Sequence, residues 1–137
     1  MKQEEILQQV KDGRLSIEEA STLLKGIEDI GYAAIDLSRQ KRNGFPEIIY
    51  GEGKNIEQLI GIITAMNEHK TAILATRVNA EKGEALSQAF PEGVYEPLGR
   101  TFVLNPIAPK HEHYIAVVTA GTSDIPVAEE AAVTAET

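Results

Sequence analysis

Apolar residues recur at helical spacing through the first thirty residues of the chain. A first short helix would end at Gly13, because glycine commonly terminates helices. Ser16 and Glu19 have the spacing of a capping box and predict the start of a second helix. We therefore expect residues 1–30 to form a small helical hairpin. The apolar positions behind this prediction are Ile6, Leu7 and Val10, then Ile17, Ala20, Leu23, Leu24 and Ile27.

The second helix of this hairpin carries the longer apolar stripe, close to a 3.6-residue repeat. Two short helices cannot bury such a stripe by themselves. We therefore expect it to pack against the rest of the protein or against a partner.

Between residues 31 and 107 the pattern changes to short apolar runs that alternate with helical stretches. Residues 31–44 contain no clear period and predict a loop. Capping residues at Asn55, with Gln58 in the capping-box position, and at Asn79 predict the starts of two helices. The expected strands are residues 47–50, 72–76 and 101–104, and the buried face of the first helix is Leu59, Ile62, Ile63 and Met66. This βαβαβ order predicts a small parallel or mixed sheet covered by helices, an α/β domain.

The last stretch, residues 108–137, predicts the start of a further α/β domain. Residues 105–113 contain two prolines and no hydrophobic period, which is typical of a linker. Residues 115–119 form a continuous β-branched apolar run, as in a buried central strand of a parallel sheet. A turn then leads into an alanine-rich helix from about Pro126. We expect the other strands of this domain to lie outside the sequence, rather than the run joining the preceding sheet.

Composition and charge exclude several classes of function. The formal net charge is −8 and the pI is about 4.9. Nucleic acids and anionic membranes attract clustered cations, and the one local basic cluster here is Arg39, Lys41 and Arg42. The chain has no cysteine, no apolar run of membrane-spanning length and no signal-peptide pattern at its start. We expect a cytoplasmic protein with neither nucleic acid nor membrane as a partner.

The strongest chemical candidate is the loop between the apolar run and the last helix. Ligands of α/β proteins bind at the carboxyl ends of parallel strands, where helix N-termini attract anions. Gly121 would let a ligand approach the backbone, and Thr122 and Ser123 would add hydroxyl donors. Asp124 would repel a phosphate, but it could hold a ribose hydroxyl, orient a donor or transfer a proton. The alternative is that Asp124 only caps the helix, with Pro126 in its first turn.

Residues 51–55, GEGKN, resemble part of a phosphate-binding P-loop. That motif requires a glycine where Ile48 stands and a serine or threonine where Asn55 stands. Without the hydroxyl a ligand for magnesium is missing. We therefore interpret these residues as a glycine-rich turn before a capped helix.

Other charged residues allow both a functional and a structural interpretation. Arg39 and Arg42 could bind a phosphate or a carboxylate through two donors each, although exposed ion pairs explain their presence equally well. Arg77 directly follows a predicted strand, where a functional loop could begin. His111 and His113 would share one side of an extended segment, but two histidines do not complete a metal site, and we interpret them as incidental. His69 is expected at the surface, near the end of a helix.

Four stretches of the chain resemble the LarB family of nickel-pincer nucleotide biosynthesis. The GFPE…YGEGK and VVTAGTSD…AEEA segments are specific in combination, and the resemblance extends over nearly the whole chain. Members of this family are about twice as long, so the chain would represent roughly their first half. The stretches are residues 44–59 (GFPEIIYGEGKNIEQL), 73–77 (ILATR), 95–104 (YEPLGRTFVL) and 115–136 (IAVVTAGTSDIPVAEEAAVTAE).

The resemblance implies a fold and an activity. The C-terminal part of LarB proteins is similar to AIR carboxylase of purine biosynthesis, a three-layer α/β fold whose first strand leads into a Gly-Ser-x-Ser-Asp type loop. The implied enzyme carboxylates the pyridinium ring of nicotinate adenine dinucleotide with carbon dioxide and cleaves its pyrophosphate. The products are AMP and pyridinium-3,5-biscarboxylic acid mononucleotide, the precursor of the nickel-pincer cofactor of lactate racemase. Homo-oligomers with sites between subunits are implied as well.

The resemblance also implies roles for individual residues. Asp124 and Ser123 would be catalytic, and Gly121 and Thr122 would join them in binding substrate. The family is thought to use a cysteine that adds to the pyridinium ring, and this chain contains none, so we expect these residues alone to be inactive. No resident cofactor or metal is implied with certainty, and magnesium stays open. Weaker candidates for contacting the dinucleotide or a partner subunit are Arg39, Arg42, Lys54 and Arg77.

Two other functions remain open from the sequence. A non-catalytic interaction domain would explain the missing nucleophile and the apolar stripe of the first helices. An AIR carboxylase acting on the purine intermediate would share the loop that contains Ser123 and Asp124. The long N-terminal extension favours the LarB-type reaction over the purine one.

Overall fold

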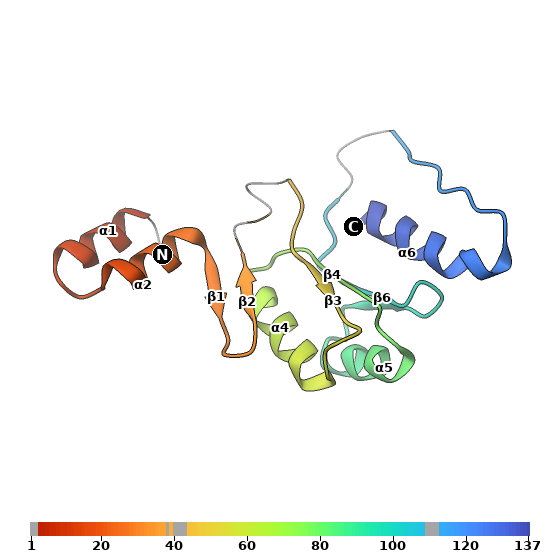
Figure 1. The fold of residues 1–137 in the computed structure, drawn as a ribbon, viewed down its shortest axis with the longest axis horizontal. Helices are drawn as coiled ribbons and strands as arrows, with labels where there is room; N and C mark the ends of the chain where they lie inside the picture. The colour runs from red at the N-terminus through yellow and green to blue at the C-terminus, as the bar shows by residue number, and fades with distance from the viewer. Residues whose placement is uncertain (1–2, 38, 40–43, 109–112) are drawn as a thin grey trace. The chain divides into compact units, whose positions relative to one another are not determined.

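The computed structural model describes residues 3–37, 39, 44–108 and 113–137. The chain divides into an N-terminal unit, residues 1–47, and a C-terminal unit, residues 48–137. Both units combine helices with strands (Figure 1), so the predicted α/β class is correct at this level. The division into segments 1–30, 31–107 and 108–137 stays a prediction.

The N-terminal unit begins with the predicted helical hairpin. Helix α1 covers Gln3–Lys11 and helix α2 covers Ile17–Lys25. The capping box is complete: Ser16 accepts from the backbone N–H of Glu19, and the Glu19 carboxylate accepts from the backbone N–H of Ser16 at 2.8 Å. The bond from the backbone N–H of Ser16, and after it a side-chain hydrogen bond with Ser16, lower the pKa of the Glu19 carboxyl group. Helix α2 ends at Gly26 in the left-handed conformation.

A small β-hairpin follows, and it corrects the prediction of a loop over residues 31–44. Strand β1, Ile27–Asp29, pairs antiparallel with strand β2, Ala34–Asp36. Gly31 makes the tight connection possible, because its φ of +90° is strained for a residue with a side chain. Each strand has three residues and Ile35 alone of them is buried, so neither leaves a periodic signal in the sequence.

The apolar stripe of α2 is buried only in part. Ala20 is 4% exposed, whereas Ile17 is 74% exposed. Leu23 and Leu24 are also exposed. The expectation that the hairpin cannot cover this stripe by itself agrees with the structure.

The C-terminal unit is built on a mixed four-stranded sheet in the order β3-β4-β6-β5. Strands β3 and β4 are parallel, and the remaining neighbours are antiparallel. The predicted strands and helices are confirmed to within about two residues, and β5 was not predicted. The elements are β3 Ile48–Tyr50, α4 Ile56–Glu68, β4 Ile73–Thr76, α5 Ala80–Ala89, β5 Val94–Glu96 and β6 Thr101–Leu104.

Helix α4 makes the crossover between the two parallel strands, as parallel pairing requires. The structure confirms the capping box of Asn55 and Gln58 and the side-chain cap of Asn79. Helices α4 and α5 pack against each other and against the sheet (Figure 1). The predicted buried face of α4 is confirmed in full, and it meets the central strand β4. That face is Leu59, Ile62, Ile63 and Met66.

Residues 115–119 are not a buried strand, contrary to the prediction. They belong to no helix or strand, and Ile115 and Val118 are 79% and 88% exposed. A strand is stable only when neighbouring strands accept its backbone hydrogen bonds. No described strand pairs with this run. Beyond it, helix α6, Ile125–Glu136, confirms the predicted C-terminal helix.

Candidate functional site

The carboxyl ends of β3 and β4 lie at the same edge of the sheet because these strands are parallel. Gly51 follows β3 there and Arg77 follows β4. The backbone N–H of Gly51 donates to the carbonyl oxygen of Thr76 at 2.8 Å. A Cβ atom on Gly51 would lie 2.8 Å from that same oxygen, closer than side-chain carbons come. Only glycine therefore lets the turn after β3 press against the end of β4.

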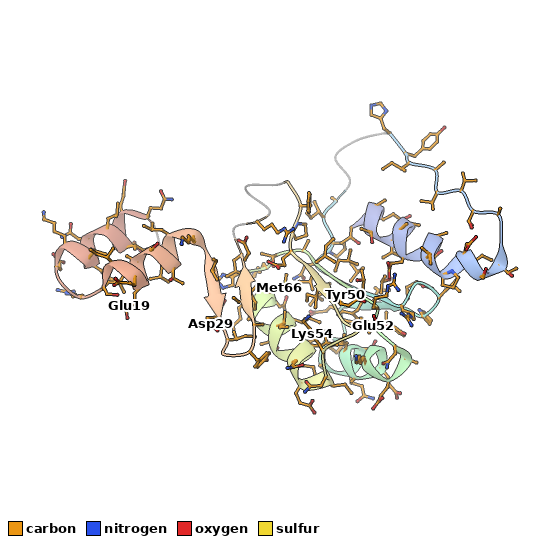
Figure 2. The ribbon with its side chains drawn as sticks, in the orientation of Figure 1. Glu19, Asp29, Tyr50, Glu52, Lys54 and Met66 are labelled. Carbon is orange, nitrogen blue, oxygen red and sulfur yellow. The ribbon has the colours of Figure 1, made fainter. Side chains whose placement is uncertain are left out.

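The turn over residues 51–54 leads directly into the capped start of α4, which confirms the prediction of a glycine-rich turn before a capped helix. The hydroxyl of Tyr50, the last residue of β3, donates to the Glu52 carboxylate, and Figure 2 shows both side chains beside Lys54. This hydrogen bond raises the pKa of Tyr50 and lowers the pKa of Glu52. Among nearby charges, Arg77, Arg100 and Lys82 lower the pKa of Glu52 further.

Two lysines bind the backbone of this turn. The Nζ atom of Lys54 donates to the carbonyl oxygen of Tyr50 at 2.9 Å. The Nζ atom of Lys82 donates to the carbonyl oxygens of Gly51 at 2.9 Å and Glu52 at 3.3 Å. Lys82 reaches the turn from the first turn of α5, whose start is set by the Asn79 cap. Both ammonium groups are thereby brought to the edge where the parallel strands end.

Two arginines complete the edge, and both have a left-handed backbone. Arg77 has a φ of +55° and Arg100 a φ of +52°. For a residue of this size the conformation costs on the order of 1 kcal/mol, and such strain tends to gather at functional sites. The backbone N–H of Val78 donates to the carbonyl oxygen of Arg100 at 2.8 Å, which holds the two arginine positions side by side.

Helix α6 approaches the same edge. Its Glu130 carboxylate lies 2.8 Å from Nε of Arg77. A Cβ atom on Gly99 would lie 2.9 Å from the backbone nitrogen of Glu130, so the turn between β5 and β6 touches the helix backbone. We call Lys54, Arg77, Lys82 and Arg100 the cationic edge. Acidic side chains lie near it as well: Glu52 and Glu130, and Glu96, whose carboxylate accepts from the backbone N–H of Gly99 beside Arg100.

The loop predicted as the main site lies elsewhere along the chain and is open to solvent. Thr122, Ser123 and Asp124 form one turn of 3₁₀ helix that runs into α6, and all three are exposed. The Asp124 side chain makes no capping hydrogen bond, so the interpretation that it only caps the helix is wrong in this structure. Gly121 has φ −127°, ordinary extended backbone. The use of this loop for substrate stays a prediction.

Of the predicted site residues, Lys54 and Arg77 come together with the turn after β3. Arg39 belongs to the N-terminal unit, where its Nη1 atom lies 3.8 Å from the Glu47 carboxylate. This contact agrees with the alternative that Arg39 forms an ion pair. Arg42 and His111 lie outside the described residues. His69 and His113 are exposed. Across the described parts of the chain, no group of three or more His, Asp or Glu residues could hold a metal ion.

Sequence reasoning missed Tyr50, Glu52, Lys82 and Arg100. The available signal was positional: Tyr50 ends a strand, Arg100 precedes one, and Lys82 lies in the first turn after a cap. Parallel pairing brings strand ends together, but the sequence did not show which cations would reach the same end.

None of the described helices is long and apolar enough to cross a membrane. A family model described as the LarB/PurE-like N-terminal domain matches residues 27–106. An uncharacterized protein of Methanocaldococcus jannaschii is 33% identical to the chain. That alignment covers 96% of this chain and 56% of the archaeal protein, so the chain spans about half the length of this relative.

Proposed function

This chain belongs to the family of LarB/PurE-like N-terminal domains, and we propose that it serves a LarB-type carboxylase and hydrolase. The proposed reaction adds carbon dioxide to the pyridinium ring of nicotinate adenine dinucleotide and hydrolyses the pyrophosphate. The products are AMP and pyridinium-3,5-biscarboxylic acid mononucleotide, the nickel-pincer precursor. The observation that carries the proposal is the family match over residues 27–106.

In this proposal the loop before α6 places the substrate. Thr122 and Ser123 have exposed hydroxyl groups that can donate to a carboxylate or a phosphate. The Asp124 carboxylate has no capping bond, which leaves it able to hold a ribose hydroxyl or transfer a proton. An electron-poor pyridinium attacks carbon dioxide only after a nucleophile has added to the ring. The chain has no cysteine, so the proposal assigns that nucleophile to a part of the enzyme outside these residues.

The test is an assay of the full-length enzyme with nicotinate adenine dinucleotide and labelled bicarbonate. We expect AMP release together with label in the mononucleotide product. Asp124→Asn should slow both by about a hundredfold, the lower range for a proton-transfer group. Glu136→Gln, an exposed change of equal charge on α6, should have no effect. Failure of the full-length enzyme to release AMP would exclude the reaction.

The same assay separates the purine alternative. An AIR carboxylase would carboxylate the aminoimidazole ribonucleotide and leave the dinucleotide unchanged. We expect the reverse preference. Carboxylation of the purine intermediate alone would assign the protein to the other branch of the family.

A second candidate function, from a different class, is a non-catalytic interaction domain. The exposed Ile17, Leu23 and Leu24 of α2 favour it. If it is correct, the chain should fold cooperatively and retain a partner without binding any nucleotide. A Leu23→Ser, Leu24→Ser double variant would then lose the partner, whereas AMP release in the assay above would be unaffected.

A further inference from the structure

The cationic edge collects a large share of the positive charge of its unit. Residues 48–137 contain six lysines and arginines, and four of them form this edge. The same residues contain twelve acidic side chains, so the concentration is not a general property of the unit. We propose that Lys54, Arg77, Lys82 and Arg100, with the turn after β3, bind the phosphate group of a small-molecule ligand.

The lysines have the hydrogen-bonding capacity for such a ligand. Each ammonium group has three N–H donors. Lys54 uses one on a carbonyl oxygen and Lys82 uses two, and among the described residues neither forms an ion pair. Neutral carbonyl oxygens do not neutralise an ammonium group, and the charge of Lys82 acts on Glu52, whose pKa it lowers, without a direct ion pair between described residues. A phosphate would supply a direct charged partner and further acceptor atoms for these two groups.

The arginines point to the same class of ligand. A guanidinium group presents a planar fork of donors that fits phosphate oxygens. Both arginines are held in a left-handed backbone at the ends of neighbouring strands, and Gly51 lets the turn approach Thr76 closely. The carboxyl edge of parallel strands is where α/β proteins place ligands. Four cations from four segments of the chain favour a multiply charged anion over a single carboxylate.

Glu130 is the group that such an anion has to displace. Its carboxylate lies 2.8 Å from Nε of Arg77. A phosphate at the edge would compete with this carboxylate for the guanidinium group. Removal of the Glu130 charge should therefore strengthen phosphate binding. If only the net charge of the protein mattered, removal of any other acidic charge on α6 would strengthen binding equally.

Titrations of the isotopically labelled full chain, followed by its amide resonances, test the site. The ligands are inorganic pyrophosphate and AMP, each compared with sodium chloride at equal ionic strength to control for screening. We expect saturable shifts of the amides at residues 51–54, 77, 78 and 100 with both phosphates. Equal saturation would indicate recognition of the phosphate alone, and tighter binding of AMP would indicate a nucleotide as its source. Shifts that chloride reproduces, or no shifts at these amides, would overturn the proposal.

Matched variants locate the site within the chain. Lys82→Met should weaken pyrophosphate binding by about three- to tenfold, the loss of one partly screened charge contact. Lys70→Met removes the same charge at the far end of α4, about 20 Å from the turn, and should change little. Arg100→Asn tests an arginine with a residue that tolerates the left-handed backbone, so that folding is preserved. Equal affinity for all three variants would contradict the proposal.

The Glu130 variant completes the test. Glu130→Gln should tighten pyrophosphate binding by about threefold, whereas Glu136→Gln on the same helix should not. Equal gains from both would mean that only net charge matters and would count against the site. This binding depends on the edge of β3 and β4 and on no step of the proposed carboxylation, so either proposal can fail while the other stands.

Discussion

Two short apolar runs of this chain have similar composition but differ in secondary structure and burial. Strand β4, Ile73–Thr76, lies between β3 and β6, and Ile73 is completely buried. Residues 115–119 contain the same kinds of residue, yet they form no strand and Ile115 is 79% exposed. Both runs were predicted to be buried strands.

The difference shows that an apolar β-branched run specifies a strand only where neighbours are provided. The crossover through α4 brings β3 to one side of β4, and β6 returns antiparallel on the other. Every backbone group of β4 can then be paired and its side chains covered on both faces. The described residues provide no such neighbours for residues 115–119.

Truncation of an isoleucine in each run gives the largest expected contrast. Ile73→Ala should lower the free energy of unfolding by about 2–5 kcal/mol, because it removes a buried side chain and leaves a cavity. Ile115→Ala removes the same atoms from an exposed position and should change it by less than about 0.5 kcal/mol. Urea unfolding followed by circular dichroism measures both. A comparable loss from Ile115→Ala would mean that residues 115–119 are packed in solution.

Two glycines, Gly93 just before β5 of the sheet and Gly121 just after residues 115–119, give a smaller contrast. A Cβ atom on Gly93 would lie 2.2 Å from the buried Phe102 ring, so Gly93→Ala should force that ring aside and cost about 1–3 kcal/mol. A Cβ atom on Gly121 would come no closer than 3.4 Å to another residue, the Asp124 carboxylate. Gly121→Ala should therefore leave the free energy of unfolding nearly unchanged. Equal thermal midpoints for both variants would show that Phe102 can move at no cost.

The sequence predicted the local elements well and the long-range pairing incompletely. Capping boxes at Ser16 and Asn55 and the periodic face of α4 depend on residues close in sequence, and the structure confirms them. The hairpin of β1 and β2 was missed because three-residue strands have almost no period. The prediction of a buried strand over residues 115–119 was wrong because burial depends on neighbouring strands, which the pattern of a single run does not show.

The candidate site shows the same limit. Arg77 was singled out because it directly follows a predicted strand, and Lys54 lies in the turn that resembles part of a P-loop. Lys82 and Arg100 come from other elements, and their approach to the turn after β3 depends on how α5 and β6 pack. The loop of residues 121–124 was chosen because it lies between a predicted buried strand and a helix, and its use for substrate remains a prediction.

The N-terminal caps of α4 and α6 should differ by about 1 kcal/mol in their contribution to the free energy of unfolding. Asn55 accepts from the backbone N–H of Gln58 at 2.8 Å, so Asn55→Ala should lower the free energy of unfolding by about 1 kcal/mol. Asp124 occupies the corresponding position of α6 without such a bond, and Asp124→Ala should have almost no effect. Chemical denaturation of the two variants measures the difference. A loss with Asp124→Ala as large as with Asn55→Ala would restore the capping role for Asp124.

The smallest effect concerns ionisation at the cationic edge. The hydrogen bond to Glu52 raises the pKa of the Tyr50 phenol above its ordinary value of 10.0. The raised pKa means that the bond contributes stability below the ordinary tyrosine pKa and that this contribution is lost as pH rises through the folded value. The difference in tyrosinate absorbance between the wild type and Tyr50→Phe isolates the titration of Tyr50. Glu52→Ala should move that titration to lower pH, because it removes both the acceptor and the negative charge. A titration that Glu52→Ala leaves in place would show that the Tyr50–Glu52 bond does not persist in solution, so that the turn after β3 would be held by the bonds of Gly51, Lys54 and Lys82 without it.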